Sequence, residues 1–433
     1  MQLAGWGRYP SSEVRVTAIK TEDDLARTLR QANGLCIARG MGRSYGDSSL
    51  APHVIDLRQH DHFLGFDSDR GTVRCDAGAT LAAILEVIVP RGWFLPVTPG
   101  TGFVSVGGAI ASDVHGKNHH RDGSFVDFVE SFRVMIPNGE LVTCSDEENA
   151  ELFHATAGGM GLCGIIVDAD LKLRRIQSGF VDERIVKTND LCDTLACLDE
   201  NDQATYVVAW LDANKRGTAR GRALVMIGEH AQNDDFKIHR KQHARVPFDL
   251  PSMCLNRLVM RLFNSLYYER IRTRTTTRRT HYEPYFYPLD RLRDWNRLYG
   301  RAGLLQHQSV VPRASAGEAI EALLSCLAAS RLGSPLAVLK ALGEGNENYL
   351  SFPRAGYTLT MDFKRSDSAL ALMGRLDDIV LTHGGRMYLA KDACMSESTF
   401  KRSYPAWEAF QAVRERHGAL GRFSSLQAQR LGL

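Results

Sequence analysis

Ala38-Arg39-Gly40-Met41-Gly42-Arg43-Ser44-Tyr45-Gly46-Asp47 is the stretch of sequence that decides the fold of this chain. It follows a short apolar run, and its glycines let consecutive backbone N–H groups turn inward and form a concave nest for an anion. A second glycine-rich stretch comes later, as Pro99-Gly100-Thr101 followed by Val106-Gly107-Gly108-Ala109. Each stretch alone is compatible with an ordinary tight turn. Together they predict a ligand with two adjacent phosphates, held mainly by backbone groups.

Two other motifs share letters with the first stretch but do not fit its context. The dinucleotide fingerprint GxGxxG would begin at Gly40, but its third glycine comes one residue late, at Gly46. The nucleophile elbow GxSxG matches residues 42–46. Both motifs need a helix directly after the turn. Here Pro52 and the extended run 54–57 follow, so we predict a strand–loop–strand unit instead.

The composition is that of an ordinary folded protein with 433 residues, of which 44% are hydrophobic and 24% are charged. This length predicts two or three domains. The net charge of +3 gives no support for nucleic-acid binding, and we expect none. Nine cysteines without a CxxC pair indicate reduced thiols in a reducing compartment.

The N-terminal residues 1–8 lack the apolar segment of a signal peptide, and no apolar run is long enough to span a bilayer. We therefore expect a cytoplasmic protein, free or peripheral on the inner membrane, without signal peptide or transmembrane segment.

Hydrophobic periodicity divides the chain into three parts. Residues 1–178 predict an α+β unit of short mixed strands without the regular alternation of a doubly wound sheet. Residues 179–385 predict a second domain with an antiparallel sheet and helices on one face, and residues 386–433 a strand-like segment (386–392) and a closing helix from about residue 396. The other expected elements are helices after Thr21, Thr80 and Asp146 and at 316–331 and 367–383, and strands at 35–38, 54–57, 73–77, 129–136, 140–144, 164–173, 206–211, 222–227, 336–339 and 357–363.

The second part also contains an apolar helical pattern next to a basic run. Residues 251–268 place large apolar side chains at helical spacing, interrupted by Arg257 and Arg261. The run 270–279 is strongly basic, and we predict it to be weakly ordered. An amphipathic helix with a basic flank is typical of a contact with an anionic membrane surface. Peripheral membrane association through residues 250–280 is one interpretation, and a core-facing helix followed by a solvated loop is the other.

The segment Asp113-Val114-His115-Gly116-Lys117-Asn118-His119-His120 directly follows the second glycine-rich stretch. Its three histidines lack the ligand spacing of a metal site, and we predict a loop with no metal. A polar loop with satisfied histidines is one alternative. The other is a site in which His115 and Lys117 face a substrate hydroxyl beside a bound cofactor. Gln306-His307-Gln308 predicts a strand whose two amides point to one face and bind sugar hydroxyls, or form a polar cluster between domains.

These motifs, in this order and with Ala390-Lys391-Asp392 near the end, resemble the flavin oxidases of the vanillyl-alcohol-oxidase superfamily. Within it, the chain is similar to the decaprenylphosphoryl-β-D-ribose 2-oxidase family over nearly its whole length, and HGKNHH at 115–120 is the most specific part. The resemblance implies an α+β fold of two domains. A PCMH-type FAD-binding domain would span 1–178, an inserted antiparallel-sheet substrate domain 179–385, and a C-terminal segment, 386–433, would return to the FAD domain.

The resemblance also implies the residues around the cofactor. Several superfamily members attach the flavin to a histidine in the first glycine loop, whereas this loop carries Tyr45 and no histidine, which implies non-covalent FAD. The residues implied to line FAD are Arg39, Gly40, Met41, Gly42, Arg43, Ser44, Tyr45, Pro99, Gly100, Thr101, Ser105, Gly107, Gly108, Ala109, His115, Gly116 and Ile165.

The implied reaction is the FAD-dependent oxidation of a secondary sugar hydroxyl to a ketone, namely the 2-hydroxyl of a polyprenyl-phosphoryl pentose. It would be the first half of an epimerisation in cell-envelope glycan synthesis, completed by a separate keto-reductase. His115 is implied as the orienting or basic group and Lys391 as its electrostatic partner. The implied substrate-binding residues are Lys117, Gln306, Gln308, Lys340 and Thr360, and Thr360 stands where that family carries a reactive cysteine.

Two other functions stay open on the sequence. One is a soluble alditol or aldonolactone oxidase of the same superfamily, which a free sugar alcohol would reduce rapidly. The other is a sugar-nucleotide or phospholipid-binding module without redox activity, which would be colourless or would hold a flavin that no sugar bleaches.

Overall fold

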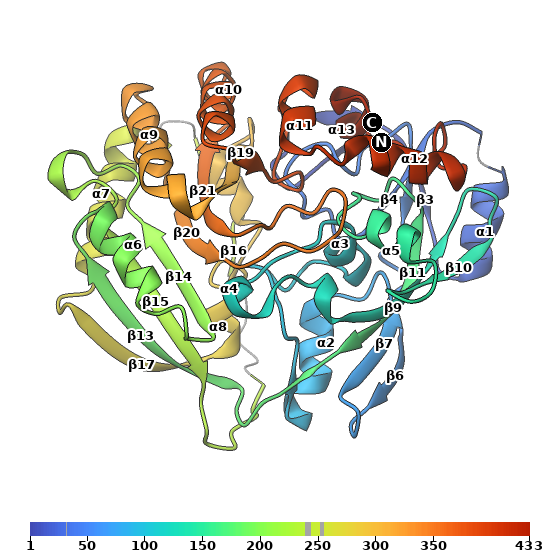
Figure 1. Cartoon of the computed structure of the whole chain (residues 1–433), viewed down its shortest axis with the longest axis horizontal. Helices are drawn as coiled ribbons and strands as arrows, with labels where there is room; N and C mark the ends of the chain where they lie inside the picture. The colour runs from blue at the N-terminus through green and yellow to red at the C-terminus, as the bar shows by residue number, and fades with distance from the viewer. Residues whose placement is uncertain (32, 239–243, 252–254) are drawn as a thin grey trace.

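The computed structural model describes residues 1–433 except 32, 239–243 and 252–254. Figure 1 shows two regions, one built on short strands and one on a large sheet with helices along its outer side. The α+β class predicted from the sequence is confirmed. Within the described residues, no helix has the length and apolarity needed to cross a membrane.

Among the described residues, the first region contains a three-stranded and a five-stranded sheet besides two two-stranded ones. The three-stranded sheet is parallel and has the order β3 (Arg15–Ala18), β5 (His53–Asp56), β4 (Cys36–Arg39). The five-stranded sheet is antiparallel and has the order β10 (Leu141–Cys144), β9 (Val129–Met135), β11 (Ile165–Lys172), β7 (Thr72–Asp76), β6 (Phe63–Asp67). Further elements of this region are β1 (Gln2–Ala4), β2 (Ser11–Glu13), α1 (Glu22–Gln31), α2 (Leu81–Ile88), β8 (Trp93–Phe94), α3 (Val106–Ala111), α4 (His119–Asp122), α5 (Ala150–Thr156) and β12 (Arg174–Arg175).

Helix α2 shows how the local sequence produces these elements. The Thr80 hydroxyl accepts a hydrogen bond from the Ala83 amide at 3.2 Å, which satisfies one of the free amides at the helix start. Leu81, Ile84 and Leu85 lie on one face and are fully buried. Burial of each such side chain contributes about 1.5–3 kcal/mol, so the helix is held mainly by this face.

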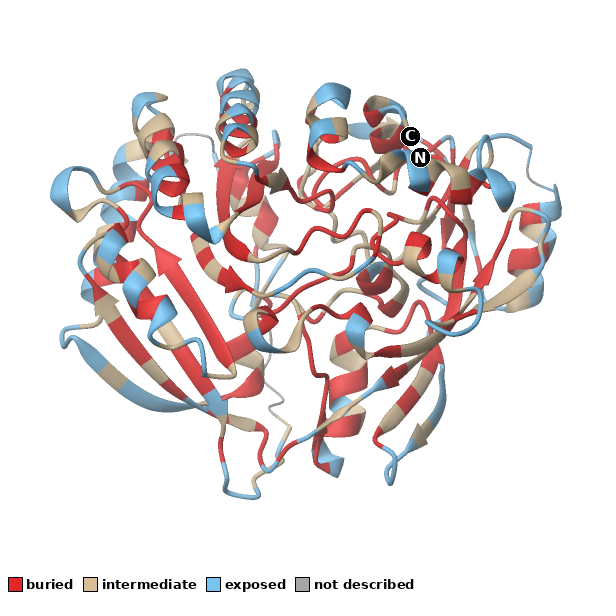
Figure 2. Cartoon of the chain, in the orientation of Figure 1, coloured by how far each residue is buried: buried red, intermediate tan, exposed pale blue. Residues whose placement is uncertain are grey.

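The second region is built on an antiparallel eight-stranded sheet. Its strands, in spatial order, are β17 (Thr275–His281), β13 (Phe180–Thr188), β15 (Ala223–His230), β14 (Tyr206–Leu211), β20 (Ala337–Leu342), β21 (Gly356–Lys364), β19 (Leu304–Val311) and β22 (Arg386–Met387). Helices α6 (Leu191–Asp199), α9 (Ala316–Ala329) and α10 (Asp367–Thr382) cover one face. Smaller elements are β16 (Ala244–Arg245), α7 (Arg257–Glu269), α8 (Tyr282–Phe286) and β18 (Leu292–Arg293). In Figure 2, β14 is buried throughout, whereas the edge strand β17 is largely exposed.

The basic run 270–279 differs from its prediction in its second half, because residues 275–279 are ordered in strand β17. β17 pairs with β13, and two of its arginines face acidic residues across the ladder. Arg278 lies 2.5 Å from Glu183, and Arg279 lies 2.7 Å from Asp182. Opposite charges on directly facing strand positions stabilise the pairing, so these two arginines are part of the sheet.

Two other local predictions were wrong. Asp146 does not cap a helix, since α5 begins after Asn149, whose φ of +49° is left-handed. The strand expected at 386–392 is reduced to Arg386–Met387, and the single closing helix is three helices, α11 (Glu397–Ser403), α12 (Trp407–Arg416) and α13 (Leu426–Leu431).

The C-terminal segment packs against the first region. The Cys36 amide donates to Arg422 O at 2.9 Å, and the Ser424 amide donates to Cys36 O at 3.0 Å. The Arg422 guanidinium also donates to Leu29 O at the end of α1, at 2.9 Å. The end of the chain is therefore hydrogen-bonded to the edge of the parallel sheet, beside the first glycine-rich loop.

Candidate active site

The first glycine-rich loop joins β4 to β5 and lies open to a cavity. Within the described residues, the backbone amides of residues 40–44 have no hydrogen-bond acceptor. Gly42 has a φ of +63°, which turns this part of the loop. Consecutive amides without an internal acceptor form a site for an anion. The loop thus leaves these amides available to an anion, and the predicted nest stays a prediction.

The second glycine-rich stretch differs from this expectation. Ser105 caps α3 by accepting from the Gly108 amide at 3.3 Å, and the Gly107 amide donates to Ala77 O at 2.8 Å. A Cβ on Gly107 would lie 2.9 Å from the Ala77 Cβ, so glycine here permits close packing of α3 on the residue that follows β7. Gly100 and Thr101, just before it, are the residues whose amides lack an acceptor within the described chain.

The cavity of about 1240 Å³ lies between the first region and the large sheet. Typical ligand pockets measure roughly 300–1,000 Å³, so this one has room for a cofactor together with a substrate. It is lined by fourteen of the predicted cofactor residues: Gly40, Met41, Gly42, Arg43, Ser44, Tyr45, Pro99, Gly100, Thr101, Ser105, Gly107, Gly108, His115 and Gly116.

Three predicted cofactor residues do not line the cavity. Arg39 donates to Ala4 O at 2.7 Å and to the Ser49 hydroxyl at 2.9 Å. Its side chain therefore connects the loop to neighbouring segments. Ala109 is buried within α3, and Ile165 belongs to the core between β11 and α1. Because side chains alternate along a strand, Ile166 lines the cavity in place of Ile165.

One face of the large sheet packs against α6, α9 and α10. The predicted substrate-binding residues of the sheet lie on the opposite face. Gln308 of β19 pairs with Thr360 of β21, and Thr360 pairs in turn with Val338 of β20. Gln306 and Lys340 stand two residues from these pairs, so alternation places them on the same face. All four predicted residues of the sheet, Gln306, Gln308, Lys340 and Thr360, line the cavity.

His115 lies at the junction of the two regions. Its Nε2 is 2.9 Å from Gln308 Nε2, and its ring packs against Phe352 and Tyr388. Its Nδ1 is buried and has no hydrogen-bond partner within the described chain. Burial, reinforced by the charges of Lys340, His119 and Lys391, holds the His115 pKa well below its usual 6.5, so the ring is neutral at physiological pH.

Three lysines converge on the same cavity, and burial lowers the pKa of each. The pKa of Lys340 falls to about 7, because burial and the charges of Lys391 and Lys117 add together. The pKa of Lys117 falls to about 8. The pKa of Lys391 also falls to about 8, with Asp362 opposing the effect of burial. An anionic ligand in this cavity would favour the protonated form of each lysine.

The Lys391 ammonium lies 4.1 Å above the centre of the Tyr45 ring, a cation–π contact. The Tyr45 hydroxyl accepts from Gln306 Nε2 at 3.1 Å, and the same amide donates to the buried Asp362. Asp362 also accepts from the Tyr299 hydroxyl at 3.1 Å. Burial raises the Asp362 pKa to about 6. Our sequence reasoning missed Asp362, although a carboxylate inside the apolar strand 357–363 was a usable signal.

The other two histidines of the 113–120 segment do not join His115 in a metal site. His119 Nδ1 accepts from the Gly343 amide at 3.2 Å, and His120 Nε2 lies 2.9 Å from Ala204 O. Both therefore fix the segment against the second region. Lys117 also contacts the second region, since its ammonium donates to Tyr285 O and lies 4.1 Å above the centre of the Tyr285 ring.

Arg430 of α13 connects the two loops that carry the site. It donates to Asp47, which ends the first glycine-rich loop, at 2.7 Å and to Asp392, which follows Lys391, at 2.9 Å. Both carboxylates are nearly buried, with 5% of each side chain exposed. Removing Arg430 would leave two adjacent charges buried without a cation.

We expect Arg430→Met to lower the free energy of unfolding by about 3–5 kcal/mol, the usual cost of breaking a buried ion pair. Urea unfolding monitored by tryptophan fluorescence measures this loss. Arg416→Met is the matched control, because Arg416 forms an exposed pair with Glu151 and its loss should cost about 0–1 kcal/mol. Equal effects of the two variants would contradict the bridging role of Arg430.

An apolar arm extends the cavity away from the lysines along the sheet. Val208 and Trp210 of β14 and Met226 of β15 form its floor, and Leu336 and Val338 continue it. Phe263 and Tyr267 of α7 form its outer wall. The cavity therefore has a polar, cationic part at His115 and an apolar part at α7, and Glu183, Arg270 and Arg278 also line it.

Comparisons with known proteins agree with this architecture. A family model described as an FAD binding domain matches residues 15–145. Decaprenylphosphoryl-β-D-ribose oxidase from Mycolicibacterium smegmatis is 34% identical over 451 aligned residues, which cover 100% of this chain and 97% of that protein. An uncharacterised protein from Streptomyces coelicolor is 31% identical and covers 82% of this chain and 100% of its own length. Human Δ(24)-sterol reductase is 27% identical over 25% of this chain and 21% of its own.

Proposed function

This chain belongs to the decaprenylphosphoryl-β-D-ribose oxidase family of FAD-dependent oxidoreductases, and from that premise we propose that it oxidises the 2-hydroxyl of a polyprenyl-phosphoryl pentose to a ketone. FAD is its cofactor, and it supplies the hydride acceptor when bound. The free amides of residues 40–44 fit its diphosphate. Residues 40–46 contain no histidine or cysteine, which supports non-covalent attachment at this loop.

The observation that carries this proposal is the continuity of a polar and an apolar end within one cavity. A free sugar alcohol or a lactone needs only the polar end. A lipid-linked sugar needs both, with the sugar at His115, the phosphate among the lysines and the first prenyl units against Trp210 and Met226. The arrangement of the lining residues therefore favours a lipid-linked substrate over a soluble one.

The side chains have separate tasks in this proposal. Gln306 and Gln308 bind sugar hydroxyls, and Gln308 also orients the His115 ring. His115 orients the reacting hydroxyl, because its Nε2 accepts from Gln308 Nε2 and the neutral ring therefore carries its own proton on Nδ1. The proton of the hydroxyl leaves through water. Lys391 stabilises the negative charge that develops on the substrate oxygen as the proton leaves. Lys117 and Lys340 bind the phosphate.

Anaerobic mixing tests the proposal directly. Short-chain polyprenyl-phosphoryl-β-D-ribose should bleach the flavin absorption band of the yellow protein within one turnover, and mass spectrometry should identify a 2-keto product. Ribitol and pentonolactones serve as soluble competitors. Faster reduction by one of these would favour a soluble alditol or aldonolactone oxidase, and a colourless protein that takes up no FAD would overturn the proposal.

We also propose a keto-reductase as a functional partner, because a 2-keto sugar must be reduced from the opposite face to complete an epimerisation. The expected readout is conversion of lipid-linked ribose to its 2-epimer only when both enzymes are present. Accumulation of the epimer with this protein alone would contradict it.

Substrate affinity should depend on pH because the lysines have lowered pKa values. A phosphodiester stays ionised, whereas Lys340 loses its proton near pH 7 and Lys117 and Lys391 lose theirs near pH 8. A bound anion favours the protonated lysines, so affinity should be highest below pH 7. Above that pH it should fall by up to about tenfold per pH unit for each proton taken up on binding. Titration calorimetry between pH 6 and 9 measures this slope. Lys340→Gln should bind more weakly with a shallower slope, and a flat wild-type profile would contradict the role of the lysines.

Helix α7 supports a peripheral contact with the membrane that holds the lipid substrate. Its inward face is Met260, Asn264 and Tyr268, and the Asn264 amide donates to Asp212 at 3.2 Å. Its outward face is apolar and exposed: Leu258, Val259, Leu262, Phe263 and Leu266. A surface helix in water normally buries its apolar side chains and exposes its polar ones. This helix buries an amide and exposes leucines, an arrangement that suits a lipid surface. We propose that α7 docks on anionic lipid, with the exposed arginines of the flanking segment facing head groups. Residues 252–254 of the helix predicted at 251–268 lie outside the described residues.

Leu262→Glu should weaken binding to vesicles of phosphatidylglycerol and phosphatidylcholine by at least about tenfold. The change removes one inserted apolar side chain, worth about 1.5–3 kcal/mol, and adds a charge that anionic lipids repel. Vesicle sedimentation measures the loss. Leu420→Glu is the control, since Leu420 is an exposed leucine in the turn after α12. If both variants sediment like the wild type, α7 is not the docking surface.

A further inference from the structure

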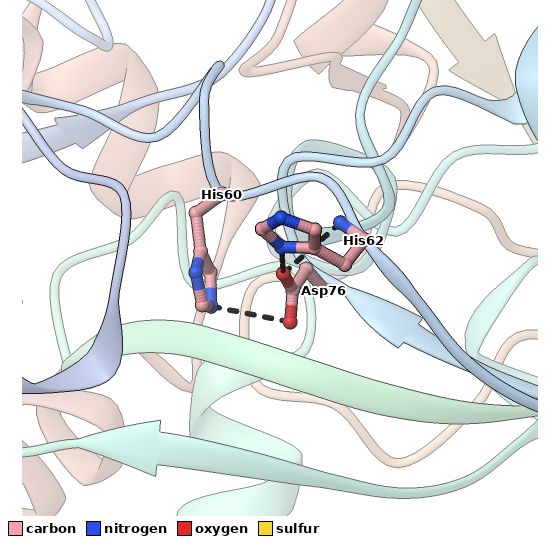
Figure 3. Close-up of side chains that lie close together, drawn as sticks. All are labelled: His60, His62 and Asp76. Carbon is pink, nitrogen blue, oxygen red and sulfur yellow. Dashed lines mark hydrogen bonds and ion pairs between the residues drawn. The ribbon is translucent and has the colours of Figure 1, made fainter.

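A second group of polar side chains lies in the first region, and none of its members lines the cavity. His60, His62 and Asp76 each offer one ligand atom, and these atoms lie within 4.8 Å of one another. Figure 3 shows both imidazole rings beside the Asp76 carboxylate. The histidines belong to the segment between β5 and β6, and Asp76 ends β7, so the group connects a loop to a strand.

Asp76 is a buried carboxylate without a permanent cation. Only 3% of the residue is exposed. Its ion pairs within the described chain are to His60 Nε2 at 3.3 Å and to His62 Nδ1 at 2.8 Å. Histidine carries no permanent charge, unlike lysine or arginine. Buried carboxylates in proteins are usually paired with a cation or coordinate a metal. Asp76 therefore lacks the positive charge that such a carboxylate usually has beside it.

His60 is oriented as metal-binding histidines are. The residue is buried, and its Nδ1 lies 3.2 Å from Lys20 O, a carbonyl to which only an N–H can donate. The proton is therefore on Nδ1, and the Nε2 lone pair faces Asp76. Nε2 itself is buried and makes no hydrogen bond within the described chain. A backbone carbonyl that fixes the tautomer in this way is the typical outer partner of a ligating histidine.

We propose that His60 Nε2, His62 Nδ1 and one Asp76 oxygen bind a single Zn²⁺ or a similar transition-metal dication. Two imidazoles and one carboxylate are a donor set that zinc accepts, and a tetrahedral site with bonds of about 2.0–2.1 Å places its ligand atoms about 3.3–3.4 Å apart. The three ligand atoms lie within 4.8 Å of one another, and the two histidines contact different Asp76 oxygens, Oδ1 at 3.3 Å and Oδ2 at 2.8 Å, so a small shift of the exposed His62 ring would bring all three to one ion. His62 is exposed, so water completes the coordination from the solvent side. The ion would hold the segment after β5 against β7 and has no part in the oxidation.

The test uses the full-length, untagged, FAD-loaded protein after treatment with a chelator. Calorimetric titration with ZnCl₂ should give one ion per chain in the wild type. His62→Ala should weaken binding by more than the roughly 10–100-fold that loss of an outer partner costs, because it removes a ligand. Since His62 is exposed, this variant should fold normally. His417→Ala, at the end of α12, is the matched control and should bind zinc like the wild type.

Thermal unfolding provides a second readout. Zinc should raise the melting temperature of the wild type and of His417→Ala but not of His62→Ala, and Mg²⁺ should leave all three unchanged because it prefers oxygen ligands. Absence of stoichiometric zinc binding would overturn the proposal and leave a carboxylate shared by two histidines. Equal affinity in His62→Ala and the wild type would overturn it as well.

Discussion

Lys391→Met is expected to lower the rate of flavin reduction by a saturating lipid-linked ribose by about 10²–10³-fold. Loss of one preorganised group that stabilises developing negative charge has an effect of this size, about 2.7–4 kcal/mol. Lys391 is half-buried at the cavity wall and lies 4.1 Å from the centre of the Tyr45 ring, and the Asp362 carboxylate favours its charged form. Methionine has a similar length without the charge, so the cavity should keep its shape. Stopped-flow absorbance at the flavin band under anaerobic conditions measures the rate.

The controls separate catalysis from folding and from binding. Lys391→Arg keeps the charge and should recover part of the rate. Lys401→Met, on the partly exposed side of α11 and outside the cavity lining, should behave like the wild type. FAD content and melting temperature should be similar in all three. If Lys391→Met raised only the substrate concentration for half-saturation and left the limiting rate unchanged, Lys391 would be a binding group and our assignment would be wrong.

Local signals in the sequence predicted much of the fold. The Thr80 cap and the apolar spacing after it gave α2 to within a residue, and alternation at 357–363 gave β21. The failures have a common cause, namely pairing with distant residues. The basic run was predicted to be weakly ordered, yet Arg278 and Arg279 each pair with an acidic residue of β13, a strand that lies almost a hundred residues earlier.

The same distinction applies to the site. Glycines in sequence predicted the free amides of residues 40–44, because a nest is a local backbone feature. The role of the second stretch was not predicted correctly. Gly107 is needed for close packing against Ala77, a contact that only the tertiary structure reveals. Ile165 was predicted to line the cofactor, but its side chain lies in the core. Which side chains of a strand point to the core depends on the register of the strand, and the sequence alone did not reveal it. The His60–His62–Asp76 group joins a loop to a strand and has no spacing motif.

Ser44→Asp is expected to reduce FAD affinity by about 10³-fold and to yield a nearly colourless protein. Ser44 lines the cavity within the run of residues whose amides have no acceptor. A carboxylate there would occupy those amides and repel a diphosphate. At about 4 Å and an effective dielectric constant of about 20, the repulsion between two unit charges is about 4 kcal/mol, which corresponds to roughly a thousandfold change.

Ser44→Asn separates this charge effect from a change of shape, because the amide has nearly the size of the carboxylate and no charge. It should retain FAD with at most about a tenfold loss. The free energy of unfolding of the two apoproteins should be similar, since Ser44 makes no side-chain hydrogen bond to another described residue. Titration of each apoprotein with FAD, followed by quenching of flavin fluorescence, gives both dissociation constants. Because the amides are the proposed seat of the diphosphate, the prediction depends on charge alone. Equal affinities for Ser44→Asp and Ser44→Asn would therefore show that the diphosphate lies elsewhere, and would remove the main structural argument for how this chain holds its cofactor.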